Sequence, residues 1–181
     1  MHPGTAFLAL GSLLAAACAP HRPPEPAAPT PVLEPEDPPC ARAADAAERL
    51  RACAEQCHDG VLADCAALAR LIHRGDGAPR DSAFAALLYR YACDSGHAPS
   101  CHELGNMYYF GDGLPQDSER AVALYDRLCG QGFTTACLVL GYLFERGLGV
   151  RRDAARALRE YRRACALGSS AACSLVEQMA R

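Results

Sequence analysis

Apolar residues recur at helical spacing in three stretches of the chain. In each stretch a leucine is followed by a small residue and, three positions later, by a large apolar residue. The three sets are Leu68, Ala69 and Ile72; Leu104, Gly105 and Tyr108; and Leu140, Gly141 and Phe144. Residues at this spacing lie on one side of an α-helix. The pattern predicts three helices that bury this side, with the small residue where a neighbouring helix comes close.

A period of 36 residues relates these stretches and extends beyond them. It joins six sets of residues, and two of the sets form a C-x7-C motif in every repeat. The sets are Asp45, Asp81, Asp117 and Asp153; Tyr89, Tyr125 and Tyr161; Cys57, Cys93, Cys129 and Cys165; Gly60, Gly96, Gly132 and Gly168; Cys65, Cys101, Cys137 and Cys173; and the pairs Gly75 with Gly77, Gly111 with Gly113 and Gly147 with Gly149. Chance does not align six sets, so the chain is built from repeats.

Each recurring residue has a local structural meaning. The aspartate is expected to cap a helix that runs about 13 residues to the first cysteine. The glycine three residues after that cysteine suits a left-handed C-terminal cap. A second helix is expected to begin near the second cysteine and to end at the G-x-G pair. Each repeat is therefore a helix hairpin, and residues 40–181 are predicted to form an all-α fold of eight helices, a right-handed α-solenoid.

Eleven cysteines in 181 residues indicate an oxidising compartment and a disulfide framework. In each C-x7-C motif one cysteine ends a helix and the other opens its antiparallel neighbour, which brings the two within bridging reach. The expected pairs are Cys57–Cys65, Cys93–Cys101, Cys129–Cys137 and Cys165–Cys173, with Cys40–Cys53 as a candidate fifth bridge. A zinc site needs clustered thiols such as C-x2-C, which the chain lacks. We expect neither a metal nor a cofactor.

Residues 1–18 have the features of an export signal, with an apolar run too short to span a bilayer. The run leads into Cys18 as in a bacterial lipobox, so Cys18 is the candidate lipidated residue. Ala15 rather than a leucine stands three positions before it, which departs from the lipobox pattern. The alternative is simple secretion after cleavage of an A-x-A site formed by Ala15 and Ala17.

Residues 19–39 form the predicted linker to the repeat domain. Nine of these residues are proline. Proline fixes φ and removes backbone donors, so an extended polyproline II spacer is expected.

The second helix of each hairpin has a face opposite its buried leucine. Positions two, five and eight after the second cysteine lie on that face, and they differ between repeats while the framework stays constant. They are Ala67, Arg70 and His73; Glu103, Asn106 and Tyr109; and Val139, Tyr142 and Glu145. Such variation is expected of a ligand-binding concave groove, and equally of an unconstrained solvent face.

The repeats resemble the Sel-one-like repeat family, a relative of the tetratricopeptide repeats. The stretches that carry the resemblance are Leu104 to Tyr108 with Gly111 and Gly113, and Leu140 to Tyr142 with Gly147. The C-x7-C motif at this period is more narrowly similar to the Helicobacter cysteine-rich proteins, and the resemblance covers Asp45 to Arg181. It implies a protein-binding groove in which Asn106 clamps an extended peptide. For the Helicobacter relatives it also implies weak β-lactam binding or hydrolysis.

The composition narrows the function classes. The net charge of −3 suggests neither nucleic acid nor an acidic membrane surface as a partner. The chain has no lysine, which serine β-lactamase motifs need. His58, His97 and His102 accompany no recognisable nucleophile. We therefore expect no catalytic residue and an exported, monomeric scaffold that binds an envelope protein or an extended peptide, in the periplasm, as an outer-membrane lipoprotein, or secreted. A weak β-lactam-binding protein or hydrolase is the alternative.

Overall fold

The computed structural model describes residues 39–42 and 45–180, and within them it contains helices and no strand. The predicted signal, Cys18 and residues 19–38 of the linker lie outside the described residues. A short 3-10 helix, η1, precedes eight α-helices. The bounds are η1 Pro39–Arg42, α1 Ala46–His58, α2 Leu62–Arg74, α3 Ser82–Asp94, α4 Ala98–Phe110, α5 Ser118–Gly130, α6 Thr134–Arg146, α7 Ala154–Ala166 and α8 Ser170–Met179.

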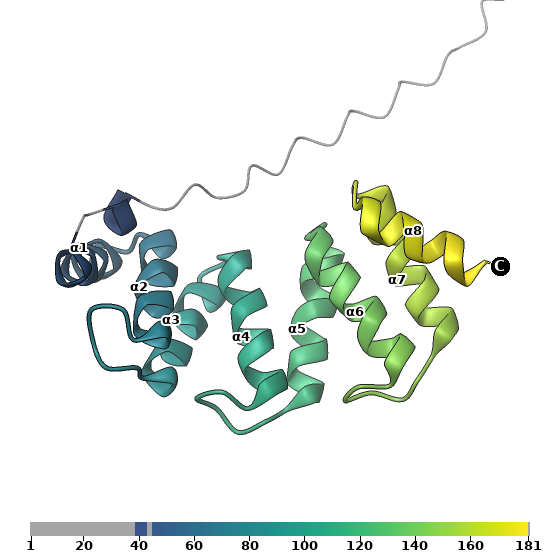
Figure 1. Ribbon diagram of the computed structural model, residues 1–181, viewed down its shortest axis with the longest axis horizontal. Helices are drawn as coiled ribbons and strands as arrows, with labels where there is room; N and C mark the ends of the chain where they lie inside the picture. Colours follow the sequence, from purple (N-terminus) through teal and green to yellow (C-terminus); the bar gives the residue numbers. More distant parts are fainter. Residues whose placement is uncertain (1–38, 43–44, 181) are drawn as a thin grey trace, which may run out of the picture. The chain divides into compact units, whose positions relative to one another are not determined.

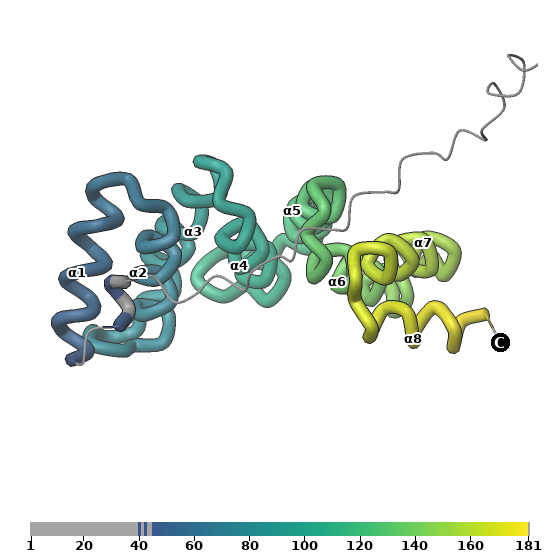
Figure 2. The backbone as a smooth tube through the Cα atoms, turned by 90° about the horizontal axis from the view of Figure 1, so that it is seen from above, coloured from purple at the N-terminus to yellow at the C-terminus, as the bar shows by residue number. Residues whose placement is uncertain are grey.

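The helices follow one another in chain order from α1 at one end to α8 at the other, and each packs on the next (Figures 1 and 2). The prediction of an all-α solenoid of hairpins is confirmed. The second helix of each hairpin begins earlier than predicted, three residues before its cysteine, at Leu62, Ala98, Thr134 and Ser170.

The four recurring aspartates cap α1, α3, α5 and α7. Asp81, Asp117 and Asp153 each accept a hydrogen bond from the backbone N–H three residues later, at 2.8–2.9 Å, and Asp45 accepts from that of Ala47 at 3.4 Å. Each cap satisfies a backbone N–H that the first turn of a helix leaves unpaired. The aspartates therefore fix where each repeat begins.

The second glycine of each G-x-G pair is required by packing as well as by backbone conformation. Gly113 has φ +73°, and a Cβ there would overlap the backbone carbonyl of Ser82 at the start of α3. Gly77 stands in the same relation to Ala46 at the start of α1, with the added Cβ 2.6 Å from its carbonyl oxygen. Each loop between two hairpins thus packs on the first residue of the hairpin that precedes it.

The buried tyrosines pack where the small residues were predicted to allow close approach. Tyr125 and Tyr161 are each 1% exposed. A Cβ added at Gly105 would lie 3.0 Å from the ring of Tyr125, and one at Gly141 would lie 2.6 Å from the ring of Tyr161. A larger residue at either glycine would push the two helices apart, so the glycines are part of the core.

All five predicted disulfides are present, with Cα–Cα distances of 4.5–4.9 Å. Four staple the two helices of a hairpin, and Cys40–Cys53 joins η1 to α1. Asp64 lies beside this last bridge, within 4.8 Å of both sulfurs. Because the sulfurs are bonded to each other, they offer no thiolate to a metal ion.

No helix among the described residues is long and apolar enough to cross a membrane.

Candidate binding surface

The seven predicted binding residues lie on three alternate helices. Each is half-buried or exposed, and none is fully buried. They are Arg70 and His73 on α2; Glu103, Asn106 and Tyr109 on α4; and Tyr142 and Glu145 on α6. The prediction was wrong for Ala67, which is 1% exposed and belongs to the core. Position two after the cysteine therefore lies at the edge of the buried side of α2, because the neighbouring helices cover a wider arc than the leucine alone suggests.

Three of the predicted residues meet in one pocket of about 440 Å³. Arg70, His73 and Glu103 line it together with three residues that the sequence did not indicate as binding residues, Arg74, Arg80 and the recurring Tyr89. The lining comes from α2, α3, α4 and the loop before α3. Three arginines against one glutamate make the pocket cationic.

Asp112 holds one side of this pocket in place. Its Oδ2 lies 2.7 Å from His73 Nε2 and accepts from Arg80 Nη2 at 2.9 Å. The hydrogen bond with His73 is the main reason that the pKa of Asp112 is lowered, with the charge of Arg80 contributing. The carboxylate of Asp112 thereby orients the ring of His73 and forms an ion pair with the guanidinium group of Arg80.

Glu103 and Asn106 form a polar cluster on α4. Asn106 Nδ2 donates to Glu103 Oε2 at 3.3 Å, while Asn106 Oδ1 accepts from the hydroxyl of Tyr125 at 2.7 Å. His102 lowers the pKa of Glu103 through a side-chain hydrogen bond, against an opposing effect of burial. Asn106 therefore supports the packing of α5 as well as facing the surface.

On α6 the two predicted residues have separate roles. Tyr142 is 48% exposed, with Arg146 5.8 Å from its ring centroid. Glu145 Oε2 accepts from the hydroxyl of Tyr161 at 2.7 Å. Within the described residues, no hydrogen bond or ion pair connects either one to the cluster on α4.

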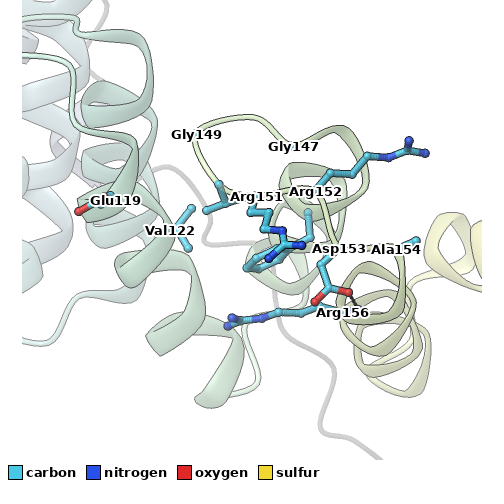
Figure 3. A pocket seen from close by; sticks show the side chains of 11 residues that line it. Glu119, Val122, Gly147, Gly149, Arg151, Arg152, Asp153, Ala154 and Arg156 are labelled. Atoms are coloured by element: carbon cyan, nitrogen blue, oxygen red, sulfur yellow. Dashed lines mark hydrogen bonds between the residues drawn. The ribbon is translucent and has the colours of Figure 1, made fainter.

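A larger hollow of about 1140 Å³ lies between α5 and the loop that joins α6 to α7 (Figure 3). Three of its polar residues already have structural partners. Asp153 caps α7, Arg152 donates to the carbonyl of Glu145, and Arg156 pairs with Asp126 and covers the ring of Phe144 at 4.2 Å. The smaller pocket is therefore the better candidate for a ligand.

An exposed apolar stripe on α3 was also missed from the sequence. Phe84, Leu87 and Tyr91 are 45%, 48% and 51% exposed and lie on one side of the helix. The residues at the same offsets in the other repeats are Glu48, Arg51 and Glu55; Arg120, Ala123 and Arg127; and Arg156, Arg159 and Arg163. Comparing repeats at these three offsets would have revealed that only α3 is apolar there.

Two of the three histidines weighed as catalytic groups have structural surroundings, whereas His58 is exposed at the end of α1. His97 Nδ1 lies 2.8 Å from the hydroxyl of Ser100, but Ser100 is fully buried and offers no oxygen to a substrate. Burial lowers the pKa of His97. His102 packs against the rings of Tyr125 and Phe133, and its Nε2 is buried with no hydrogen-bond partner among the described residues.

Comparison with known families identifies the repeat. Residues 63–97, 98–133 and 134–169 each match the Sel1 repeat, and together they make up more than half of the chain. The chain belongs to the Sel1 repeat family. The boundaries between the matched Sel1 repeats, at 97/98 and 133/134, each fall between the two cysteines of a C-x7-C motif. The disulfides Cys93–Cys101 and Cys129–Cys137 therefore join one Sel1 repeat to the next.

Solved structures show the same fold. A protective antigen of uropathogenic Escherichia coli with an SLR fold is 29% identical, with a TM-score of 0.66 over 75% of this chain and 29% of its own. A Sel1 repeat protein from Oxalobacter formigenes is 20% identical, with a TM-score of 0.69 over 74% of this chain and 55% of its own. Cysteine-rich protein B of Helicobacter pylori is 23% identical, with a TM-score of 0.58 over 75% of this chain and 98% of its own.

The chain thus spans less than two thirds of the first two of these proteins. No curated protein sequence matches it. Sel1 repeats generally mediate protein–protein interaction, and five disulfides indicate an exported or extracellular Sel1 repeat protein.

Proposed function

We propose that this protein is an exported, monomeric scaffold of the bacterial cell envelope that binds a protein or an extended peptide in a groove lined by the face of α2, α4 and α6 opposite their buried leucines. The observation that carries the proposal is the pocket to which Arg70, His73 and Glu103 contribute. These residues were singled out because they vary on a constant framework, and they prove to be neighbours in space. The repeat geometry brings equivalent faces of α2 and α4 together, and the hollow between them with its charged lining supports a ligand site.

The remaining surface supports a protein rather than a small molecule as the partner. Beside the pocket, Glu103 accepts a hydrogen bond from Asn106 on the same face of α4, and Tyr142 on α6 is exposed. Exposed aromatic residues beside charged and amide groups are typical of recognition patches. The apolar stripe of α3 adds a second surface of the same kind, since exposed apolar patches mark interaction sites.

Attachment to a membrane through Cys18 is part of the proposal. The linker of residues 19–39 would hold the repeats away from the bilayer, at up to about 3.1 Å per residue. Replacing Cys18 with serine is expected to release the protein into the soluble fraction of the periplasm or the medium. Unchanged fractionation would favour simple secretion after cleavage beside Ala17.

Site-specific cross-linking tests the binding surface. A photo-reactive amino acid at position 142 or 103 is expected to give discrete cross-linked partners in cells, whereas the same residue at exposed Arg159 on α7 is not. A second experiment places the probe at position 73 instead. Its cross-links should disappear when Glu103→Ala and Tyr142→Ser are introduced together. Asn106 is left unchanged because it accepts the hydroxyl of Tyr125, so its loss would also affect stability. Equal cross-linking at 142 and 159 would contradict the proposal.

The hydrolase alternative has a separate test. Purified oxidised protein is incubated with nitrocefin, with the reduced protein as the control for folding. Turnover by the oxidised protein alone would favour the β-lactam hypothesis over a scaffold.

A further inference from the structure

The recurring buried tyrosine donates its hydroxyl to the preceding helix in two of its three occurrences. Tyr125 donates to Asn106 Oδ1 and Tyr161 donates to Glu145 Oε2, both at 2.7 Å. Tyr89 occupies the same place 36 residues before Tyr125 and is 4% exposed. Its hydroxyl makes no hydrogen bond with another described residue. The hydroxyl is not among the fully buried polar atoms without a partner, and Tyr89 lines a pocket, so a group that enters the pocket can reach this free donor.

The acceptor is missing because the sequence changes at the two positions that supply it. The residue equivalent to Asn106 is Arg70, and the one equivalent to Glu145 is His73. An arginine has no acceptor atom, and His73 is turned toward Asp112. Tyr89 instead lines the cationic pocket together with Arg70, Arg74 and Glu103.

The repeat around Tyr161 shows what completes such a site. There the carboxylate of Glu145 accepts a hydrogen bond from the hydroxyl of Tyr161. The charge of Arg146 acts on the same phenol and lowers its pKa, against the larger effect of burial. Arg74 holds the position of Arg146 in the repeat around Tyr89, and no ion pair joins it to another described residue. Arg70 and Arg74 likewise act on the phenol of Tyr89, whose pKa is raised to about 12, mainly by burial. A hydroxyl donor and guanidinium groups are therefore in place. Glu103 also lines the pocket, but its carboxylate is engaged by Asn106 and His102, so no carboxylate accepts from the hydroxyl of Tyr89 among the described residues.

We propose that the pocket formed by Arg70, Arg74 and Tyr89 binds a carboxylate of the partner, which takes the place that Glu145 takes beside Tyr161. This inference rests on the proposed function and names the chemistry of the group that is recognised. The carboxylate comes from a peptide C-terminus or from an aspartate or glutamate side chain. Guanidinium groups and a hydroxyl donor together suit its two oxygens.

The test uses the full, oxidised chain and three short probe peptides. The peptides are Ac-GSGSG with a free C-terminal carboxylate, the same peptide with a C-terminal amide, and Ac-GSESG with a C-terminal amide. Binding is followed by NMR of the arginine Nε–Hε groups. The first and third peptides are expected to shift the Arg74 resonance and the second is not. Whichever of the two binds more tightly identifies the source of the carboxylate.

Two variants and a matched control locate the binding. Tyr89→Phe is expected to weaken binding about tenfold or more, because it removes a hydrogen bond to a charged group. Tyr125→Phe removes an equivalent buried hydroxyl whose acceptor is Asn106, so it should leave binding unchanged. His73→Glu installs the carboxylate that the third Sel1 repeat already has, and it should abolish binding of both peptides by filling the site.

Three results would overturn the inference: equal shifts with the amide peptide, equal effects of Tyr89→Phe and Tyr125→Phe, or tighter binding of inorganic phosphate than of either carboxylate peptide. The proposed function is judged separately by cross-linking at position 142. If cross-links persist while no carboxylate peptide binds, only the carboxylate site is wrong. If carboxylate peptides bind as expected and cross-links are absent, the site stands and the envelope scaffold is wrong.

Discussion

The second and third Sel1 repeats, residues 98–133 and 134–169, place the same backbone and the same buried rings around different polar groups. Gly105 and Tyr125 recur as Gly141 and Tyr161, and both tyrosines are fully buried. In the second repeat the tyrosine hydroxyl donates to the amide of Asn106, and in the third to the carboxylate of Glu145. Relative to the repeat, Asn106 lies one helical turn before the position of Glu145. Helix–helix contact therefore constrains size and shape strictly, whereas the polar partner can come from either of two positions.

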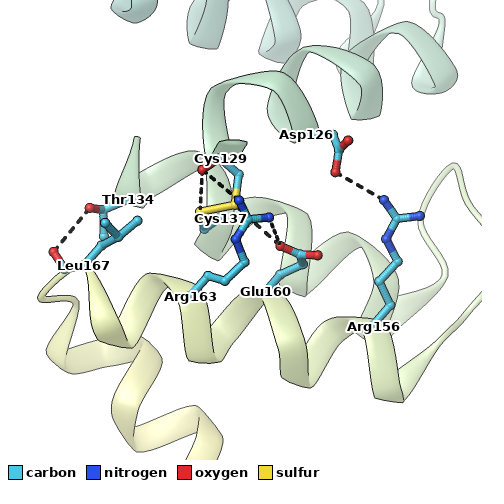
Figure 4. The surroundings of a disulfide bond; sticks show 8 residues. All are labelled: Asp126, Cys129, Thr134, Cys137, Arg156, Glu160, Arg163 and Leu167. Carbon is cyan, nitrogen blue, oxygen red and sulfur yellow. Dashed lines mark hydrogen bonds and ion pairs between the residues drawn. A yellow bond between two sulfur atoms is a disulfide. The ribbon is translucent and has the colours of Figure 1, made fainter. Parts of the chain in front are cut away.

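The disulfides that precede these tyrosines differ in their charged neighbours. Arg127 Nη2 lies 3.2 Å from Cys93 Sγ and 3.3 Å from Cys101 Sγ. At the next bridge the equivalent Arg163 donates to the carbonyl of Cys129 and pairs with Glu160, whose Oε2 lies 3.5 Å from Cys129 Sγ (Figure 4). The sulfurs of Cys93–Cys101 thus contact a guanidinium group, whereas a carboxylate lies beside one sulfur of Cys129–Cys137.

The largest difference between the two repeats is expected at their glycines. Gly141→Ala should lower the free energy of unfolding by about 2 kcal/mol, because the new methyl group would overlap a ring that is fully buried. Gly105→Ala should change it by less than about 1 kcal/mol, since the contact is looser and alanine favours the helix by a similar amount. Urea denaturation of the oxidised proteins measures both. Equal losses would mean that the two interfaces are packed alike.

The tyrosine hydroxyls should differ by a smaller amount. Tyr161→Phe removes a hydrogen bond to a carboxylate and is expected to cost about 1.5–2 kcal/mol, against about 1 kcal/mol for Tyr125→Phe, whose acceptor is neutral. Glu145→Gln keeps an acceptor and should cost less than Tyr161→Phe. Thermal and urea denaturation report these losses. A larger effect of Glu145→Gln than of Tyr161→Phe would show that the charge of Glu145, rather than the hydrogen bond, stabilises the repeat.

The environments of the two bridges predict the order in which they are reduced. A guanidinium on both sulfurs stabilises the thiolate that leaves during exchange, so Cys93–Cys101 should react before Cys129–Cys137. Arg127→Gln is expected to slow its reduction about tenfold, which corresponds to about 1.4 kcal/mol. Limited reduction followed by alkylation and peptide mapping gives both rates. The reverse order, or no effect of Arg127→Gln, would show that access of the reductant controls the reaction.

Local requirements of the backbone explain how much of this fold the sequence could predict. An N-cap such as Asp117 and a left-handed glycine such as Gly111 are recognisable because each depends only on its own turn of chain. The cysteine pairs followed from the helix ends. The pocket around Tyr89 could not be predicted, because its lining comes from three helices and a loop whose relative rotation depends on packing. Ala67 was misplaced for the same reason.

The smallest expected effect compares the last residue of α5 with that of α7, Gly130 with Ala166. A Cβ added at Gly130 would meet no atom within 4 Å, and the residue does not have a positive φ. Gly130→Ala should therefore raise the free energy of unfolding by about 0.5 kcal/mol, below the full helix-interior value because the position ends the helix. The reciprocal Ala166→Gly should lower it by a similar amount. Gly132→Ala is the contrasting control: an added Cβ would make only an ordinary contact, 3.9 Å from Leu167, but φ is +87°, so the substitution should destabilise. If Gly130→Ala destabilised as well, the end of α5 would need the backbone freedom of glycine, and the two repeats would differ in their backbone and not only in their polar groups.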